Sequence, residues 1–244
     1  MSKLSVQLYS VREAFAADPG GTLERLAAIG FTQVEPYGLT DNAAALRTAL
    51  PAAGLTAPTT HAKLVGVDQS AVFAAAAECG IGTVIDPAVR EEHWQTLDDV
   101  ASTAEALNAA AKKAAEHGIT VGYHNHWWEL QSHLGGHSAL EEFASLLDPQ
   151  VVLQVDTYWS TVGGADTPAL LRTLGSKVKA IHVKDGDLTT EPSAQLPAGQ
   201  GRAPVADILA AAPDALWVLE FDGYAGDIFE GLAASYAYVS GVAR

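Results

Sequence analysis

The sequence predicts an α/β protein whose chain folds as a single (β/α)8 TIM barrel. Three observations indicate this fold. Short apolar runs of strand length alternate with longer segments of helical periodicity, and the alternation repeats eight times along 244 residues. Glycines follow several helical segments directly, and polar residues end the apolar runs. Strict alternation of strand and helix implies a parallel sheet, and eight such units close into a barrel more readily than they form an open sheet.

The first half of the chain contains four of these units. Its apolar runs predict strands over residues 4–9, 31–36, 55–61 and 83–86. Its periodic segments predict helices over residues 22–29, 42–53, 70–79 and about 95–117. A glycine stands just past each of these helices, where a left-handed residue ends a helix without a Cβ clash. These glycines are Gly30, Gly54, Gly80 and Gly118.

The second half continues the same pattern. The predicted strands cover residues 119–124, 151–156, 178–183 and 217–221, and the predicted helices cover residues 138–147, 168–174, 205–211 and 227–238. Residues 187–204 are rich in Pro, Gly and Ser, which predicts a long loop over the barrel rim. No linker or shift in composition divides the chain, so we expect residues 1–244 to form one domain.

The composition excludes several classes of protein. Lys and Arg number 14 and Asp and Glu number 29, so the net charge is −15, which repels nucleic acid at long range. The single cysteine, Cys79, excludes a disulfide within the chain. The first ten residues lack the apolar core of a signal peptide, and no run approaches the roughly 20 apolar residues of a membrane span. We therefore expect a cytoplasmic protein without nucleic-acid or membrane partners.

Polar or ionisable side chains stand at the C-terminal end of every predicted strand. In chain order they are Tyr9, Glu35, His61, Asp86, His124, Asp156, His182 and Glu220. In a barrel these positions face a common opening. Any one of them could be a structural rim group, but four on the last four strands predict mixed nitrogen and oxygen ligands for one divalent ion. The predicted metal ligands are His124, Asp156, His182 and Glu220. Manganese, cobalt, zinc and magnesium all suit such a set.

Motifs along the chain resemble a known family. They are YHNHWWE at 123–129, QVDTYW at 154–159, HVKD at 182–185, PAGQGRAPVADIL at 197–209 and VLEFD at 218–222. In this order and at these strand ends they resemble the sugar phosphate isomerase/epimerase superfamily, the xylose isomerase-like TIM barrels that also include endonuclease IV. The resemblance implies one divalent metal, commonly manganese, with Asp156, His182 and Glu220 matching three of its ligands. Dimers and tetramers are common in such families, so it also allows a homo-oligomer.

The fourth ligand position departs from the family pattern. A Glu is usual where this chain has His124. A neutral imidazole can still bind the metal, but in sugar epimerases that Glu is also one of two acid/base groups. The YHNH form and the GGADTP segment at 163–168 resemble the branch that contains inosose dehydratases and related keto-sugar enzymes. Two reactions stay open: isomerisation or epimerisation of a small sugar, and β-elimination by a lyase on a keto-sugar or inosose at the same metal site.

Both reactions begin with loss of a proton next to a carbonyl. A bound divalent metal stabilises the resulting enolate as a Lewis acid, and a base within reach removes the proton. We expect Glu220 to be the base, with His124 and Glu35 as alternatives. Lys184 could stabilise the enolate or hold a substrate oxygen, because it shares a strand face with His182; it could equally be a rim lysine paired with Asp185 or Asp222.

The expected substrate is a small sugar or cyclitol. The side chains expected to bind it are Glu35, His61, His126, Glu129, Trp159 and Lys184. His61 and His126 could bond sugar hydroxyls, and Glu129 could orient one of these rings. Trp159, with Trp127 and Trp128, fits either stacking on a sugar face or walling the pocket.

Two other classes of protein were compared with this interpretation. A DNA repair enzyme like endonuclease IV needs further ligands for three zinc ions and a basic groove, which this acidic chain does not provide. A sugar-binding barrel without catalysis would tolerate loss of the ligand residues, yet all four are present. The sequence therefore favours a metal-dependent enzyme.

Overall fold

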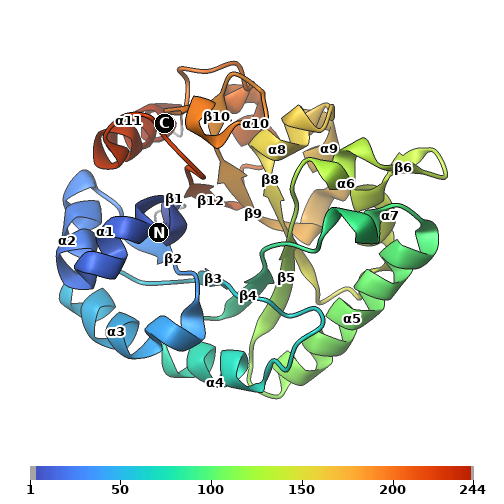
Figure 1. The fold of residues 1–244 in the computed structure, drawn as a ribbon, viewed down its shortest axis with the longest axis horizontal. Helices are drawn as coiled ribbons and strands as arrows, with labels where there is room; N and C mark the ends of the chain where they lie inside the picture. Colours follow the sequence, from blue (N-terminus) through green and yellow to red (C-terminus); the bar gives the residue numbers. More distant parts are fainter. Residues whose placement is uncertain (1–3, 243–244) are drawn as a thin grey trace.

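A parallel barrel surrounded by helices accounts for residues 4–242, which the computed structural model describes; residues 1 and 244, the predicted domain ends, lie outside this range. Eight strands form one sheet in the order β2-β1-β12-β9-β8-β5-β4-β3. They are β1 (Leu4–Gln7), β2 (Gln33–Glu35), β3 (Thr59–His61), β4 (Thr83–Asp86), β5 (Thr120–His124), β8 (Val152–Asp156), β9 (Val178–Val183) and β12 (Leu216–Leu219). Figure 1 looks down the barrel. The predicted fold class is confirmed.

The barrel closes between β2 and β3 without a regular ladder. Isolated parallel bridges join the two segments, Gln33 with Thr56 and Tyr37 with His61. Pro36 and Pro58 lie along this seam and have no amide hydrogen to donate. The strands β2 and β3 are therefore joined more loosely than the other neighbouring strands of the sheet.

Eight helices correspond to the predicted ones and pack outside the sheet, as Figure 1 shows. They are α2 (Pro19–Ile29), α3 (Leu39–Ala52), α4 (Ser70–Glu78), α5 (Leu97–Ala115), α7 (Ala139–Leu146), α9 (Thr167–Leu174), α10 (Val205–Ala211) and α11 (Ile228–Val242). Two of them, α4 and α10, begin at the predicted residue, and side-chain caps set the first residues of several others. The Asp18 carboxylate accepts a hydrogen bond from the Gly21 amide, so α2 begins at Pro19. Within residues 4–242, no helix has the length and hydropathy needed to cross a membrane.

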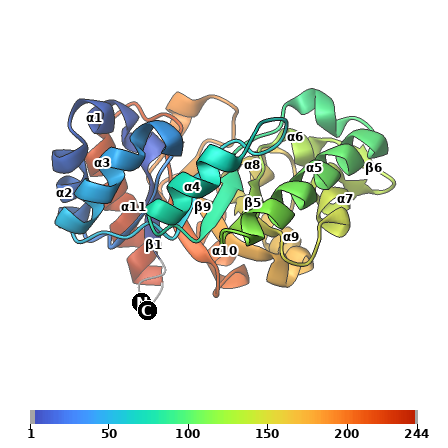
Figure 2. The ribbon, with the colours of Figure 1, turned by 90° about the horizontal axis from the view of Figure 1, so that it is seen from below.

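Short elements that the sequence pattern does not predict fill several connections. They are α1 (Arg12–Ala17), α6 (Trp128–Gln131), α8 (Thr157–Val162), the 3-10 turns η1 (Leu8–Val11), η2 (Glu91–Trp94), η3 (Gly175–Lys177) and η4 (Pro192–Ala194), and the ribbons β6 (His133–Leu134) with β7 (His137–Ser138) and β10 (Asp185–Gly186) with β11 (Gln195–Leu196). In Figure 2, α1 and α6 lie along the upper edge of the ring. The β10–β11 ribbon orders part of the predicted loop 187–204, and η1 ends the predicted first strand early.

Alternation along the strands separates an apolar layer from a polar one. Val155 and Ile181 belong to the hydrophobic core between sheet and helices. Successive side chains of a strand point to opposite faces, so their neighbours Asp156 and His182 point into the barrel. Both are fully buried. Ionisable groups at such depth need partners, and the interior near the strand ends therefore contains a polar network.

Candidate active site and metal centre

The four predicted metal ligands converge at the C-terminal ends of neighbouring strands. His124 ends β5, Asp156 ends β8, His182 lies on β9 and Glu220 directly follows β12. Each offers a ring nitrogen or a carboxylate oxygen, and these atoms all lie within 4.8 Å of one another. All four side chains are buried. Two imidazoles and two carboxylates at this spacing fit a divalent ion.

The Lys184 ammonium lies between the two carboxylates of this cluster. Its Nζ is 2.8 Å from Asp156 Oδ2 and 2.7 Å from Glu220 Oε2. Asp222, one of the two partners expected from the sequence, adds a third carboxylate at 2.7 Å, whereas the other, Asp185, accepts hydrogen bonds from loop amides. Burial lowers the pKa of Lys184, but the three carboxylates outweigh burial and raise it well above its usual value. The carboxylates are therefore already arranged around a cation.

Two carboxylates hold the His182 ring from opposite sides. Nε2 donates to Glu35 Oε1 at 2.7 Å, and Nδ1 donates to Glu220 Oε2 at 2.7 Å. Burial lowers the pKa of His182, but Glu220 and Glu35 outweigh burial and raise it to about 10. The ring is thus an imidazolium in this arrangement, and Nδ1 is the nitrogen beside the cluster.

Glu35 is enclosed beneath the cluster, away from the cavity wall. Its carboxylate accepts hydrogen bonds from Gln7 Nε2 at 2.8 Å, Gln154 Nε2 at 2.7 Å, His182 Nε2 at 2.7 Å and Thr59 Oγ1. Burial raises the pKa of Glu35, but His61 and His182 outweigh burial and lower it to about 2. The ionised Glu35 carboxylate accepts hydrogen bonds from protein groups only, and it can orient the His182 ring. Because Glu35 is enclosed, a substrate in the cavity has no direct access to this carboxylate.

Gln154 fixes the tautomers of two histidines. Because its Nε2 donates to Glu35, its Oε1 faces the other way and accepts from His61 Nε2 at 2.6 Å and from His124 Nδ1 at 3.1 Å. In the neutral His124 ring, Nε2 is then the unprotonated nitrogen. Sequence reasoning missed Gln154, although it lies two residues before Asp156 and so on the same face of β8.

The pKa values of His124 and Asp156 suit metal binding. Burial, followed by the charge of His182, lowers the pKa of His124 well below 6.5, so this imidazole is neutral at pH 7. Burial raises the pKa of Asp156 to about 6 despite the neighbouring Lys184. His124 Nε2 lies 3.6 Å from Asp156 Oδ2. A neutral imidazole beside an ionisable carboxylate provides the protonation states that metal ligands require.

A cavity of about 550 Å³ opens beside the cluster. Its wall includes His61, His124, His126, Glu220 and Asp222. The buried Nδ1 of His126 has no hydrogen-bond partner among residues 4–242. Burial, followed by Lys184, lowers the pKa of His126 to about 3, so its ring is neutral. The residue His126 lines the cavity, whereas its unpaired Nδ1 is itself covered.

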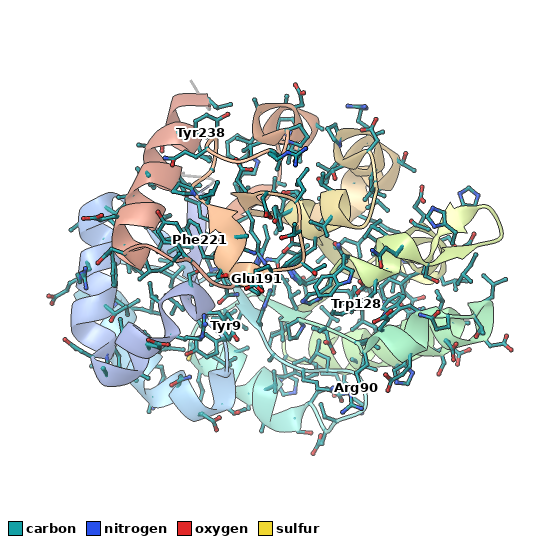
Figure 3. All side chains as sticks on the ribbon, turned by 45° about the horizontal axis from the view of Figure 1, so that its top comes forward. Tyr9, Arg90, Trp128, Glu191, Phe221 and Tyr238 are labelled. Atoms are coloured by element: carbon teal, nitrogen blue, oxygen red, sulfur yellow. The ribbon has the colours of Figure 1, made fainter. Side chains whose placement is uncertain are left out.

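Two predicted substrate-binding residues lie behind this wall. Glu129 accepts hydrogen bonds from the Tyr123 hydroxyl at 2.6 Å and from the His126 amide at 2.9 Å. Trp159 is buried, with its ring centroid 4.8 Å from that of Trp127. The His126 ring stacks on Trp128, whose position beside the barrel opening is shown in Figure 3. Neither Glu129 nor Trp159 contributes to the cavity lining.

A family model described as a xylose isomerase-like TIM barrel matches residues 23–226. The chain belongs to this family. The matched range contains all four clustered side chains, and the resemblance drawn from the motifs of the second half is confirmed.

Similar proteins include sugar and cyclitol enzymes by name. An inosose dehydratase of Mesomycoplasma hyopneumoniae (strain 7448) is 29% identical over 100 residues, which are 41% of this chain and 32% of that protein. The match therefore spans about a third of the length of this curated relative. A crystal structure of a sugar phosphate isomerase/epimerase from Parabacteroides distasonis ATCC 8503 has a TM-score of 0.84 and 23% identity, over 98% of this chain and 93% of that chain.

A second solved structure contains a metal. It is a crystal structure of the IOLI protein with a bound zinc atom, with a TM-score of 0.72 and 12% identity, over 99% of this chain and 98% of that chain. At these identities, the two solved structures establish a shared fold.

Proposed function

We propose that this protein is a divalent-metal-dependent enzyme that enolises a small sugar or keto-sugar, with isomerisation or epimerisation as the outcome. The observation that carries this proposal is the convergence of two imidazoles and two carboxylates at the edge of a cavity. Membership of the xylose isomerase-like family supports it. The similarity to a sugar phosphate isomerase/epimerase and to a zinc-bound protein of the same fold supports it further.

The proposed metal ligands are His124 Nε2, His182 Nδ1 and one oxygen each of Asp156 and Glu220; His182 would give up its Nδ1 proton when the metal binds. When bound, the ion would act as a Lewis acid toward the substrate carbonyl. We propose manganese, and the same donors also suit cobalt, magnesium or zinc.

Glu220 is the proposed base. Burial raises its pKa, but Lys184 and His182 outweigh burial and hold it well below 4.5, so the carboxylate is ionised at neutral pH. Glu220 lines the cavity, where it can reach a substrate carbon. His124 Nε2 is the alternative base in an arrangement where it does not bind the metal, because His124 Nδ1 already donates to Gln154. The Lys184 ammonium, beside Glu220, would hold a substrate oxygen and stabilise negative charge on it once the binding of a metal to Asp156 and Glu220 frees the N–H donors that now bond to these carboxylates.

The remaining predicted residues take supporting roles in this proposal. His61 and His126 line the cavity and would bond substrate hydroxyls. Glu129 would act on the substrate through His126, because it holds the His126 amide. Trp159 would support the site from behind, since Lys184 Nζ lies 5.5 Å from its ring centroid.

A specific observation favours β-elimination as the second candidate function. Epimerisation by two bases needs groups on opposite sides of the substrate, but the carboxylates lining the cavity, Glu220 and Asp222, come from the same strand end. The lining that comes from β3 and β5 carries imidazoles, His61 and His124. In elimination, one base removes the proton, the C–O bond at the next carbon breaks, and a neighbouring acid gives a proton to the departing oxygen. The similarity to an inosose dehydratase supports this alternative.

One experiment tests both candidates. The metal-loaded protein is incubated with ketoses and inososes in D2O, and exchange of the hydrogen next to the carbonyl is followed by NMR. Exchange with formation of an isomer supports isomerisation or epimerisation, and exchange with loss of water or alcohol supports elimination. Absence of exchange with every compound of the panel would exclude enolisation of these substrates.

Metal retention provides an independent measurement. His182→Ala and Asp156→Ala should each lose the metal, because each removes one of four ligands. The matched controls His133→Ala and Asp98→Ala change exposed residues outside the cluster and should retain it. Full metal content in both ligand variants would place the metal elsewhere.

A further inference from the structure

The cavity beside the metal cluster has two ends of different chemistry. The polar end comes from the segments that follow β5 and β12, with His124, His126, Glu220 and Asp222. The other end comes from the segments that follow β1, β2 and β4, and from α4. Its apolar side chains are Tyr9, Tyr37, Leu39, Val72, Pro87 and Ala88. The first half of the barrel also supplies the polar lining residues Thr40, His61 and Lys63, and its apolar side chains form a chamber continuous with the reactive groups of the second half.

The chamber has fixed walls. The rings of Tyr9 and Tyr37 meet edge to face, with centroids 5.5 Å apart and planes at 86°. The Arg12 guanidinium lies 4.3 Å above the centroid of the Tyr9 ring and donates a hydrogen bond to the Tyr9 carbonyl. Leu39 is only 1% exposed, yet it reaches the cavity surface. The apolar end is therefore a preformed surface made of packed side chains.

The cavity has room for more than a free monosaccharide. A hexose has about twelve non-hydrogen atoms, and even at the roughly 30 Å³ that a molecule of liquid water takes, these would occupy about 360 Å³. The cavity measures about 550 Å³. A sugar seated at the polar end would leave the chamber unfilled.

The side of the chamber formed by Leu39 and Val72 is also unsuited to further hydroxyl groups. A sugar hydroxyl buried against Leu39 and Val72 would lose its hydrogen bonds to water without a partner in return, which is costly. An apolar group at the same place would instead leave water favourably. The walls therefore favour a substrate whose two ends differ as the two ends of the cavity do.

We propose that the substrate is a sugar or cyclitol that carries a hydrophobic aglycone, with the reacting ring at the polar end and the aglycone in the chamber. This substrate class rests on the proposed function, because the reacting ring is assigned to the metal cluster. The edge-to-face pair of Tyr9 and Tyr37 offers aromatic surface on which an aromatic aglycone can pack.

Binding measurements with unreactive probes test this proposal separately from catalysis. Methyl and phenyl β-D-glucosides, galactosides and xylosides, and the methyl and phenyl ethers of inositol, are titrated into the metal-loaded protein by calorimetry. For at least one ring, the phenyl compound should bind tenfold or more tightly than the methyl compound. Equal affinities within each pair, or no saturable binding of any phenyl compound, would overturn the proposal.

The probes lack a ketone, so their binding requires no turnover. A phenyl preference without exchange in D2O would defeat the proposed enolisation and leave the chamber assignment standing. Exchange of free ketoses without any phenyl preference would do the reverse. The two failures are therefore distinguishable.

Variants that fill the chamber sharpen the test. Val72→Trp and Ala88→Phe add bulk to its wall, and the ratio of phenyl to methyl affinity should fall toward one in both. Ala71→Phe adds an aromatic ring to the exposed neighbour of Val72 and should keep the wild-type ratio. Circular dichroism and thermal unfolding identify any variant that does not fold. A wild-type ratio in both folded filling variants would place the phenyl group outside the chamber.

Discussion

Gln154 Nε2 donates a hydrogen bond to Glu35 Oε2 at 2.7 Å, across 119 positions of sequence. This contact turns the amide oxygen of Gln154 toward His124, whose Nδ1 lies 3.1 Å away. The ring nitrogen left for a metal is therefore decided by a residue that does not belong to the cluster. Such contacts hold a ligand ring in one tautomer and orientation.

Replacement of Gln154 should weaken metal binding without removing a ligand. Leucine is similar in size to glutamine but offers no hydrogen-bond acceptor to His124. In Gln154→Leu, the tautomer and orientation of the His124 ring are therefore no longer fixed. We expect the metal dissociation constant to rise by about 10- to 100-fold, measured by calorimetry on folded protein. Gln150→Leu, the same change at an exposed position, serves as the control. An unchanged dissociation constant in Gln154→Leu would contradict this role.

Lys184 should compete with the metal for the same carboxylates. Its Nζ forms ion pairs with Asp156 and Glu220, two proposed ligands. Lys184→Met removes the competing charge, so the metal should bind on the order of tenfold more tightly, while turnover falls because the substrate oxygen loses its cation. Lys179→Met changes an exposed lysine of the same strand and should alter neither quantity. Weaker metal binding in Lys184→Met would refute the competition.

Asp185 should stabilise the rim loop over the barrel. Its carboxylate accepts hydrogen bonds from the backbone amides of Gly199 and Gly201 at 2.9 Å and of Ala203 at 3.0 Å. Asp185→Ala leaves these amides unpaired in a partly buried loop and should lower the free energy of unfolding by about 2–4 kcal/mol, measured with urea.

The control for this loss is a second aspartate of the same loop. Asp187 is exposed and bonds its near neighbour Thr189. Asp187→Ala should change the free energy of unfolding by less than about 0.5 kcal/mol. Equal losses in the two variants would show that the Asp185 carboxylate has no special role in holding the loop.

Glu129 should make stability depend on pH. Burial raises its pKa from 4.5 to about 8, against the opposing hydrogen bond from Tyr123, so the folded state binds this proton more tightly than the unfolded state. The resulting stabilisation is complete below pH 4.5 and is lost as the pH rises through about 8. Between pH 5 and 9, wild type should lose on the order of a few kcal/mol of unfolding free energy.

Comparison with an uncharged variant isolates this contribution. In Glu129→Gln, urea unfolding at pH 5, 7 and 9 should give a flatter dependence on pH, because the buried side chain no longer titrates. Glu105→Gln removes an exposed carboxylate and should follow wild type. If Glu129→Gln and wild type lose stability in parallel, Glu129 does not cause the dependence.

The positions of His124, Asp156, His182 and Glu220 could be predicted from the sequence because each is defined locally. Period-two alternation identifies a strand, and the residue at its end is then known. In a parallel barrel all strand ends share one rim, so four local assignments already imply one cluster. The same local logic predicted the order of the eight strand and helix units, and it missed short elements such as α8 that lie on the rim.

Only the tertiary structure decided which polar residues reach the cavity beside the cluster. Glu35 and Glu129 look alike in sequence as candidates, yet Glu35 lies beneath His182 and Glu129 lies behind His126. Strand position fixes the direction of a side chain but not its depth, which depends on the side chains packed over it from other strands. The partnership of Gln154 with Glu35 was hidden for the same reason, because distant parts of the chain meet only once the barrel is closed.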